Sequence, residues 1–201
     1  MRTRLFKIAV ALGAAALASA SRAAASQAPQ GDATAGAAMA DPSQAGDIGF
    51  MGARLGMGLA AWKALAYPGR NPGDVAAACA AGRASAGGLV CTYAQRAGGL
   101  SLPLSIPLSG SWLVRDPQYD FVGGRLSRIE FHTSIDAFNA LTARFEARYG
   151  PASQTLHDDV TTRGGLDLPR VRMIWRLPAG SIEIVDPTTP PNQLAVRFAG
   201  P

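Results

Sequence analysis

A few side chains in this sequence have the types and spacing that acid–base or metal chemistry would use. Glu130 and His132 lie two residues apart in a segment with strand-like alternation, so they share one face. A carboxylate beside an imidazole could transfer protons, although a polar pair on a solvated strand explains the same spacing. His157, Asp158 and Asp159 are metal-ligand types. Because consecutive side chains rarely converge, a solvated loop before the final strands is the simpler explanation.

Glycoside hydrolysis would need two carboxylates that face a common cleft. Glu130, Glu183 and Asp186 are available on predicted strands, but nothing in the sequence places any two of them together. The sequence contains no H-E-x-x-H, Walker or G-x-S-x-G motif. The glycines within residues 52–58 have the wrong spacing for a dinucleotide fingerprint, and we interpret them as backbone turns. No catalytic residue, cofactor site or metal site is therefore predicted.

Three arginines form the most distinctive exposed pattern. Arg170, Arg172 and Arg176 alternate with apolar residues, so they lie on one face of a predicted strand. Such a row could grip an acidic partner, peptidoglycan carboxylates or lipid phosphates through forked hydrogen bonds. The alternative is a solvated sheet face whose charges protect it against edge pairing. We take these three residues as the candidate interaction surface.

The first 20 residues are typical of a cleavable secretory signal. Three basic residues precede a run of apolar and small side chains over residues 8–18, which is much shorter than the roughly 20 residues needed to span a bilayer. Ala18 and Ala20 supply the small side chains that a signal peptidase requires. We expect cleavage after Ala20, with Ala25 and Ala28 as alternative sites, and no stable membrane insertion.

Removal of the signal changes the charge of the chain. The whole sequence has 19 basic and 14 acidic residues and a net charge of +5. The signal contains Arg2, Arg4 and Lys7, so 16 basic residues remain beside 14 acidic ones. This near balance argues against a nucleic-acid partner.

Residues 21–46 are mostly small or polar and cannot bury enough apolar surface to become ordered, so we expect a flexible leader there.

The two cysteines, Cys79 and Cys91, lie 12 residues apart. In an oxidising compartment such a pair predicts a disulfide, which would stabilise the fold by roughly 3 kcal/mol if the benefit is chain entropy. A redox pair would prefer C-x-x-C spacing, and a metal site would need further ligands nearby. Because no cysteine precedes Cys79, lipid attachment at a processed N-terminal cysteine is excluded.

Two short helices are predicted after the leader. Residues 59–66 have apolar side chains at near-helical spacing and are followed by a Pro-Gly pair. Residues 72–81 begin with a polar cap and a proline and continue through alanine. A strand over residues 89–93 follows, so the disulfide would join the second helix to this strand. Residues 94–110, rich in Gly, Ser and Pro, are expected to form a loop.

The second half combines a hairpin, a helix and three strands. Alternating apolar residues over 112–122 and 125–133 predict the hairpin, with two glycines in its turn. Ser134 is a suitable N-cap for the next helix, whose apolar face comprises Ile135, Phe138, Leu141, Phe145 and Tyr149. Three strands in meander order are then predicted over residues 171–177, 181–185 and 193–198.

Together these elements predict an α+β fold for a single domain over residues 47–201. Short helices would pack on one face of an antiparallel meander sheet and leave its other face wet. The order of the elements also allows two halves, each with helix before strands, although no sequence repeat supports such a division.

Two stretches of the sequence carry a resemblance to a known family. Gly52, Gly56 and Met57 precede the expected helices, and the later run is Phe121-Val122-Gly123-Gly124-Arg125-Leu126-Ser127-Arg128-Ile129. With the cysteine-linked strand, this pattern resembles small bacterial envelope proteins of the SmpA/OmlA/BamE type, which share the fold of β-lactamase-inhibitor proteins. The resemblance implies helix pairs on antiparallel sheets, and proteins that bind other proteins without turning over substrates. The chain departs from the lipoprotein members by lacking the lipidation cysteine.

These observations lead to a hypothesis about function. We expect an exported periplasmic protein, further secretion being an alternative, that acts as a non-catalytic binding or accessory protein without a cofactor. Its partner would be an envelope protein or an anionic envelope component, and the chain would be a monomer or a weak oligomer. An envelope hydrolase with an unrecognised site is one alternative, and an inhibitor or immunity protein is another.

Overall fold

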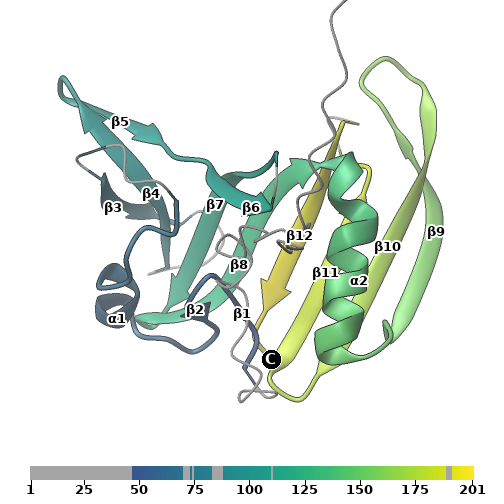
Figure 1. Cartoon of the computed structure of the whole chain (residues 1–201), viewed down its shortest axis with the longest axis horizontal. Coiled ribbons are helices and arrows are strands. Elements are labelled where there is room, and N and C mark those ends of the chain that lie inside the picture. Colours follow the sequence, from purple (N-terminus) through teal and green to yellow (C-terminus); the bar gives the residue numbers. More distant parts are fainter. Residues whose placement is uncertain (1–46, 70–72, 74, 83–87, 110, 189–191) are drawn as a thin grey trace, which may run out of the picture. The chain divides into compact units, whose positions relative to one another are not determined.

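One antiparallel sheet of ten strands dominates the part of the chain that the structure describes (Figure 1). The structure is a computed structural model, and it describes residues 47–69, 73, 75–82, 88–109, 111–188 and 192–201. The expected signal over residues 1–20 and the expected leader over residues 21–46 lie outside these ranges. Eight strands are neighbours in the order β3-β4-β7-β8-β12-β11-β10-β9, and β5 pairs with β4 while β6 pairs with β7.

The sheet strands and the smaller elements have the following bounds. The strands are β3 (Val75–Ala81), β4 (Leu89–Ala97), β5 (Leu100–Pro103), β6 (Ile106–Ser109), β7 (Trp112–Val122), β8 (Arg125–Ser134), β9 (Gln154–Thr161), β10 (Asp167–Leu177), β11 (Gly180–Asp186) and β12 (Gln193–Ala199). The other elements are β1 (Gly49–Phe50), β2 (Ala53–Arg54), α1 (Leu59–Lys63), the 3-10 turn η2 (Ile135–Ala137) and α2 (Phe138–Tyr149). Within the described residues, no helix has the length and apolar character needed to cross a membrane.

The expected α+β fold, with short helices packed on a meander sheet, is wrong. The described chain is mostly β, and strands from both expected halves join one sheet. Residues 75–81 of the expected second helix form β3, while residues 72 and 74 lie outside the described residues. Alanine favours helix, but β3 pairs with β4 along its whole length, and this pairing overrides the preference. The expected loop over 94–110 contains the end of β4 and the strands β5 and β6, and β9 was not expected.

The elements predicted from strong periodicity are confirmed. β7 and β8 form the expected hairpin, and Gly123 and Gly124 in its turn have φ values of 57° and 75°, a conformation that favours glycine. The Ser134 side chain caps the following helical segment by accepting a hydrogen bond from the backbone N–H of Asp136. Gly150 ends α2 with a φ of 81°. The three expected C-terminal strands are β10, β11 and β12.

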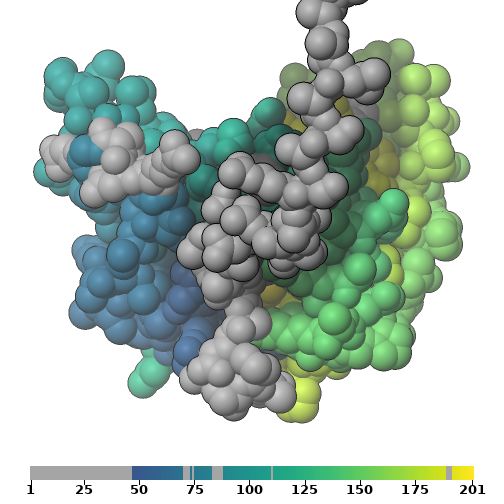
Figure 2. Space-filling view, viewed as in Figure 1, coloured from purple at the N-terminus to yellow at the C-terminus, as the bar shows by residue number. Residues whose placement is uncertain are grey.

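A row of buried side chains crosses the sheet and forms the centre of the core. We call it the dry row, and the register aligns its members in the order Cys91, Tyr119, Ile129, Phe198, Ile182 and Trp175. Aromatic rings from three other elements cover this face. The ring centroids of Trp62 in α1 and Tyr119 are 4.9 Å apart, and those of Phe145 in α2 and Trp175 are 5.6 Å apart. Phe50 of β1 lies 6.3 Å from Phe198. Seen from this side, α2 lies in green at the surface (Figure 2).

Two fully buried tryptophans occupy different parts of this core. Trp62 packs against Tyr93 and Tyr119 on β4 and β7, and its Nε1 has no hydrogen-bond partner in the described part of the chain. Trp175 on β10 donates a hydrogen bond from Nε1 to the carbonyl oxygen of Gly150, at 2.9 Å. This bond ties the end of α2 to β10.

The predicted disulfide between Cys79 and Cys91 is confirmed. The two residues face each other directly on β3 and β4, with their Cα atoms 4.1 Å apart. The bridge therefore joins two neighbouring strands and not, as expected, a helix and a strand. Because Cys91 belongs to the dry row, the bridge fastens the edge strand β3 to the core.

Removing the disulfide should destabilise the fold. The double variant Cys79→Ala with Cys91→Ala should have a free energy of unfolding about 3 kcal/mol lower than the oxidised wild type, because the unfolded chain regains the entropy of the open loop. Equilibrium denaturation measures this difference. Reductant should lower the stability of the wild type similarly and leave the double variant unchanged. Equal stability of the double variant and the oxidised wild type would contradict the expectation.

Candidate functional site

The face of the sheet opposite the dry row carries polar side chains. Because side chains alternate along each strand, the neighbours of the dry-row residues point to this other face. One row aligns Gln118, Glu130, Arg197, Glu183, Ile174 and Gln154 across six strands. A second row aligns Val90, Asp120, Arg128, Ala199, Ser181 and Arg176. We call the surface that these two rows share the polar face.

Five side chains of alternating charge form a continuous charge ladder on the polar face, namely Arg128, Glu130, Arg197, Glu183 and Arg172. At one end, the Arg128 guanidinium contacts the Glu130 carboxylate. Arg197 lies between two carboxylates, with its Nε 3.3 Å from Glu130 Oε1 and its Nη1 3.3 Å from Glu183 Oε2. At the other end, Arg172 donates from Nε and Nη2 to Glu183 Oε1, at 3.0 and 2.5 Å. The ladder spans β8, β12, β11 and β10.

Each carboxylate of the ladder is paired with two arginines. Burial by itself raises the pKa of Glu183, but hydrogen bonds and positive charge from Arg172 and Arg197 outweigh burial and hold this pKa below its usual value. The Glu130 and Glu183 side chains are only 16% and 19% exposed, so both carboxylates depend on the arginines beside them. Glu183 therefore stays ionised at neutral pH.

The three arginines predicted as an interaction surface lie on the polar face with different partners. Arg170 grips Asp158 with two hydrogen bonds, from Nε to Oδ1 at 2.7 Å and from Nη2 to Oδ2 at 2.5 Å. Arg172 belongs to the charge ladder. The Arg176 side chain is exposed and donates from Nη2 to Gln154 Oε1, at 3.4 Å. Two of the three cations are thus already paired with carboxylates of the same sheet.

The residues of metal-ligand type on β9 are separated by the alternation of that strand. Asp158 lies on the polar face, where the hydrogen bond from Arg170 holds the pKa of Asp158 below its usual value. His157 aligns with Val171 and so points to the other face. Among the residues that the structure describes, no group of three or more His, Cys, Asp or Glu side chains could hold a metal ion.

The structure brings together two of the four residues considered for acid–base chemistry. Glu130 and Glu183 both contact the guanidinium of Arg197. Asp186 lies two residues after the buried Ile184 on β11, so its side chain is on the dry side of the sheet. Burial raises the pKa of Asp186. His132 lies on the polar face, and burial is the main cause that lowers its pKa. Three of these candidates therefore lie on the polar face, and Asp186 lies on the other face.

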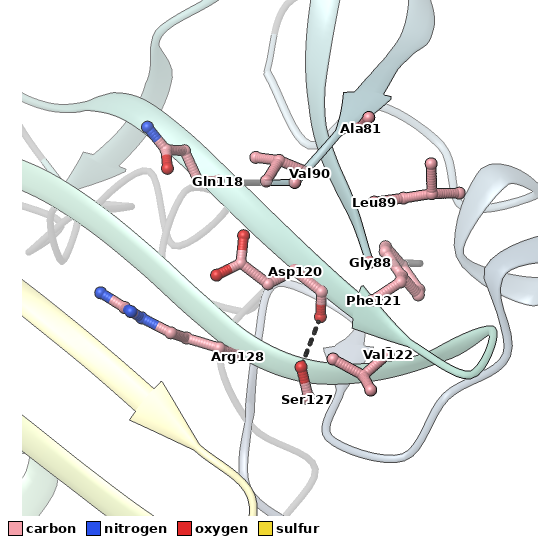
Figure 3. Close-up of a pocket in the computed structure, with 11 residues that line it drawn as sticks. Ala81, Gly88, Leu89, Val90, Gln118, Asp120, Phe121, Val122, Ser127 and Arg128 are labelled. Atoms are coloured by element: carbon pink, nitrogen blue, oxygen red, sulfur yellow. Dashed lines mark hydrogen bonds between the residues drawn. The ribbon is translucent and has the colours of Figure 1, made fainter. Parts of the chain in front are cut away.

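A hollow opens on the polar face beside the Arg128 end of the charge ladder. It has a volume of about 710 Å³ and is lined by residues of β3, β4, β7 and β8 and the segments next to them. Figure 3 shows Val90 and Val122 as apolar parts of its wall and Gln118, Asp120 and Arg128 as its polar parts. The hollow therefore offers apolar surface next to both a carboxylate and a guanidinium.

Asp120 is the residue of this hollow that sequence patterns did not reveal. Its Oδ1 atom is buried and has no hydrogen-bond partner in the described part of the chain. Burial raises the pKa of Asp120, and the positive charge of Arg128 opposes this shift. The alternation of β7 places Asp120 on the wet face, but the wall of the hollow beside it includes Ala81 of β3, a residue that was expected to be helical. No pattern in the sequence could therefore have located this hollow.

Neutralising Asp120 should stabilise the protein at neutral pH. The folded state raises the pKa of this carboxyl, so the wild type loses stability as the pH rises from the usual aspartate range, about 4, through the raised value. Asp120→Asn removes this loss. The variant should gain less than about 1 kcal/mol at pH 7, since solvent screens a half-buried group.

Thermal melts of both proteins between pH 3 and pH 8 provide the measurement. The difference in Tm should be small at the acid end and should grow toward neutral pH. A difference that does not change with pH, or one that grows toward acid, would contradict the expectation.

The polar face combines two features that can take part in binding. The charge ladder presents an ordered pattern of both signs, and the hollow holds a carboxylate oxygen that can accept a hydrogen bond from a bound group.

No protein-family model, curated protein or solved structure matches the chain, so the resemblance to the SmpA/OmlA/BamE type stays a prediction.

Proposed function

We propose that the protein is a non-catalytic binding protein of the cell envelope that holds a protein partner on its polar face. The observation that carries this proposal is the contrast between the two faces of the sheet. α1, α2 and β1 direct their buried rings to the dry face. The side chains of the charge ladder remain between 16% and 42% exposed. Ordered charge at a solvent-accessible surface is typical of recognition sites.

The balance of charge on the polar face favours a protein over a polyanion. The ladder has three arginines and two glutamates, and Arg170 is neutralised by Asp158. A lipid headgroup layer or a nucleic acid attracts surfaces of one sign. The alternating charges of the ladder instead complement a protein surface whose own charges alternate in sign. A protein with a different charge pattern would bring like charges together and would bind less well.

An envelope hydrolase is the second candidate, and Asp120 is the observation that favours it. A carboxyl with a raised pKa beside a hollow has the environment of a general acid. Its nearest charged neighbour in the hollow is Arg128, which pairs with Glu130. The ladder carboxylate Glu183 has a lowered pKa and could not donate a proton at neutral pH. Binding therefore has the stronger support.

The proposal also places the protein outside the cytoplasm, in the periplasm. The disulfide supports this compartment, because such bonds persist where the surroundings are oxidising. The composition of residues 1–20 supports export by a cleaved signal. Removal of that signal would leave 16 basic and 14 acidic residues, a balance that gives no reason to expect a polyanionic partner.

The signal can be tested by the mass of the exported protein. Expression of the full chain in a bacterial host should yield a periplasmic form that begins at Ser21, because Ala18 and Ala20 provide the small residues read by the peptidase. Ala20→Arg should block the cleavage. Intact-mass spectrometry of cell fractions measures both results, and an unprocessed wild-type chain in the cytoplasm would contradict the proposal.

Charge reversal within the ladder should weaken partner binding. Arg172→Glu places a carboxylate against Glu183, so the partner should be retained at least about tenfold less from solubilised envelopes, the effect of losing about 1.4 kcal/mol of binding free energy. Quantitative mass spectrometry of proteins retained by the immobilised chain provides the measurement.

Arg163→Glu is the matched control, since it makes the same reversal on an exposed residue outside the ladder. Its retained proteins should equal those of the wild type. Circular dichroism and thermal melts verify that both variants are folded. Retention of the same proteins by wild type and by folded Arg172→Glu would remove the basis of the proposal.

A further inference from the structure

The strand β3 forms one edge of the sheet and lacks the usual protection of an edge. In the described part of the chain it pairs with β4 alone. Its sequence is Val-Ala-Ala-Ala-Cys-Ala-Ala, with no charged residue and no proline. Natural edge strands usually carry charges, prolines or bulges that prevent another strand from pairing with them. The strand at the opposite edge, β9, carries Asp158 and Asp159.

The register shows which backbone groups point away from β4. The Cα atoms of Cys79 and Cys91 are 4.1 Å apart, the short spacing of a non-hydrogen-bonded pair. Gly82, of the other parity, donates its N–H to Gly88 across the same two chains, at 2.8 Å. The N–H and C=O groups of Cys79 therefore point outward, as do those of Ala77 and Ala81. These three residues present a row of donors and acceptors at the open edge.

The disulfide makes this edge a rigid template. An edge strand of small residues would otherwise fray, because alanine side chains bury little surface. The bridge fixes the centre of β3 to Cys91, whose side chain is fully buried. Because β3 is already held in place, a strand that pairs with it would not incur the entropy cost of ordering β3, and this favours binding.

A second, smaller hollow lies over β3 and indicates what kind of strand would fit. It has a volume of about 320 Å³ and is lined on the polar face by Ala78, Ala80, Val90, Thr92 and Gln118. The larger hollow shares Val90 and Gln118 with it. An added strand would lie about 4.8 Å beyond β3, with alternate side chains on the polar face. A large apolar side chain at such a position could cover the alanines and fill the hollow.

The same geometry argues against a second copy of this chain as the occupant. The β3 strand of another copy would bring only alanine methyl groups to the hollow and leave it unfilled.

We infer that the open edge of β3 docks an extended segment of a partner protein. The segment pairs with Ala77, Cys79 and Ala81 through its backbone and covers Ala78 and Ala80 with a large apolar side chain. This mode of strand addition takes its affinity from backbone hydrogen bonds and its specificity from alternate side chains. The inference rests on the proposed function in that it requires a protein partner, but it uses the edge and not the charge ladder.

The test is selection of peptides by the mature, oxidised protein. The probe is a display library of seven-residue peptides, the length of β3, with large apolar residues at alternate positions and threonine between them. Binders should be enriched, and a synthetic binder should bind in fluorescence anisotropy. The same peptide with N-methyl groups on the amides that face the edge should bind at least about tenfold more weakly.

Two variants of the protein locate the binding to the edge. Ala77→Pro removes an outward N–H without removing a bond to β4, and Ala80→Lys adds a protective charge to an exposed alanine. Each should weaken binding of the peptide at least about tenfold. Thr155→Lys on the opposite edge strand β9 is the matched control and should bind as the wild type does. Thermal melts verify folding, and Ala80→Lys carries the test if Ala77→Pro does not fold.

The outcomes separate this inference from the proposed function. If no peptide is enriched, or if folded Ala80→Lys or the N-methylated peptide retains full affinity, strand docking at β3 is overturned. A dimer in light scattering that Ala80→Lys disrupts would overturn the choice of a partner segment over a second copy. Peptide binding that survives in Arg172→Glu supports edge docking even if the ladder has no role. Loss of the envelope partner in Arg172→Glu with no enriched peptide leaves only the polar face as a binding surface.

Discussion

A single register of hydrogen bonds, running from Cys91 on β4 to Trp175 on β10, determines which side chains of the sheet are dry and which are wet. A slip of one residue in any pair would move the apolar members of the dry row into water. On β8 or β11, such a slip would also bring the ladder carboxylate Glu130 or Glu183 into the core, where an unpaired charge is very costly. The core and the polar face are therefore two results of one constraint.

The charge ladder is better explained by specificity than by stability. Ion pairs that lose water often gain little net free energy, because desolvation offsets their attraction. Breaking one pair is costly, since the partner charge is left without compensation. Arg197 is the clearest case, because two strands supply the carboxylates on either side of it. The ladder thus discourages alternative registers among β8, β12, β11 and β10, and it presents the same order of charges to any partner.

The sequence predicted elements where periodicity and capping were strong, as in α2 with Ser134 and Gly150, the hairpin of β7 and β8, and the last three strands. The disulfide was predicted from cysteine number and spacing. β3 was misassigned because alanine has a high helix propensity in isolation, whereas cross-strand pairing is a non-local effect that no short window shows. The wet face of Arg170 and Arg172 followed from alternation, but their carboxylate partners come from neighbouring strands, whose register the sequence does not contain. The hollow beside Asp120 was hidden for the same reason.

The two buried tryptophans lie in different parts of the core. The Trp62 indole N–H has no hydrogen-bond partner in the described part of the chain, and it is surrounded by the rings of β4 and β7. The Trp175 indole instead donates to the Gly150 carbonyl, beside α2. The two indoles therefore lie in different environments, one with a hydrogen bond from its N–H and one without such a bond among the described residues. A third tryptophan, Trp112 at the start of β7, is only partly buried. Replacing Trp112 by phenylalanine would leave fluorescence from the two core tryptophans alone, one on the disulfide-linked side of the sheet and one beside α2.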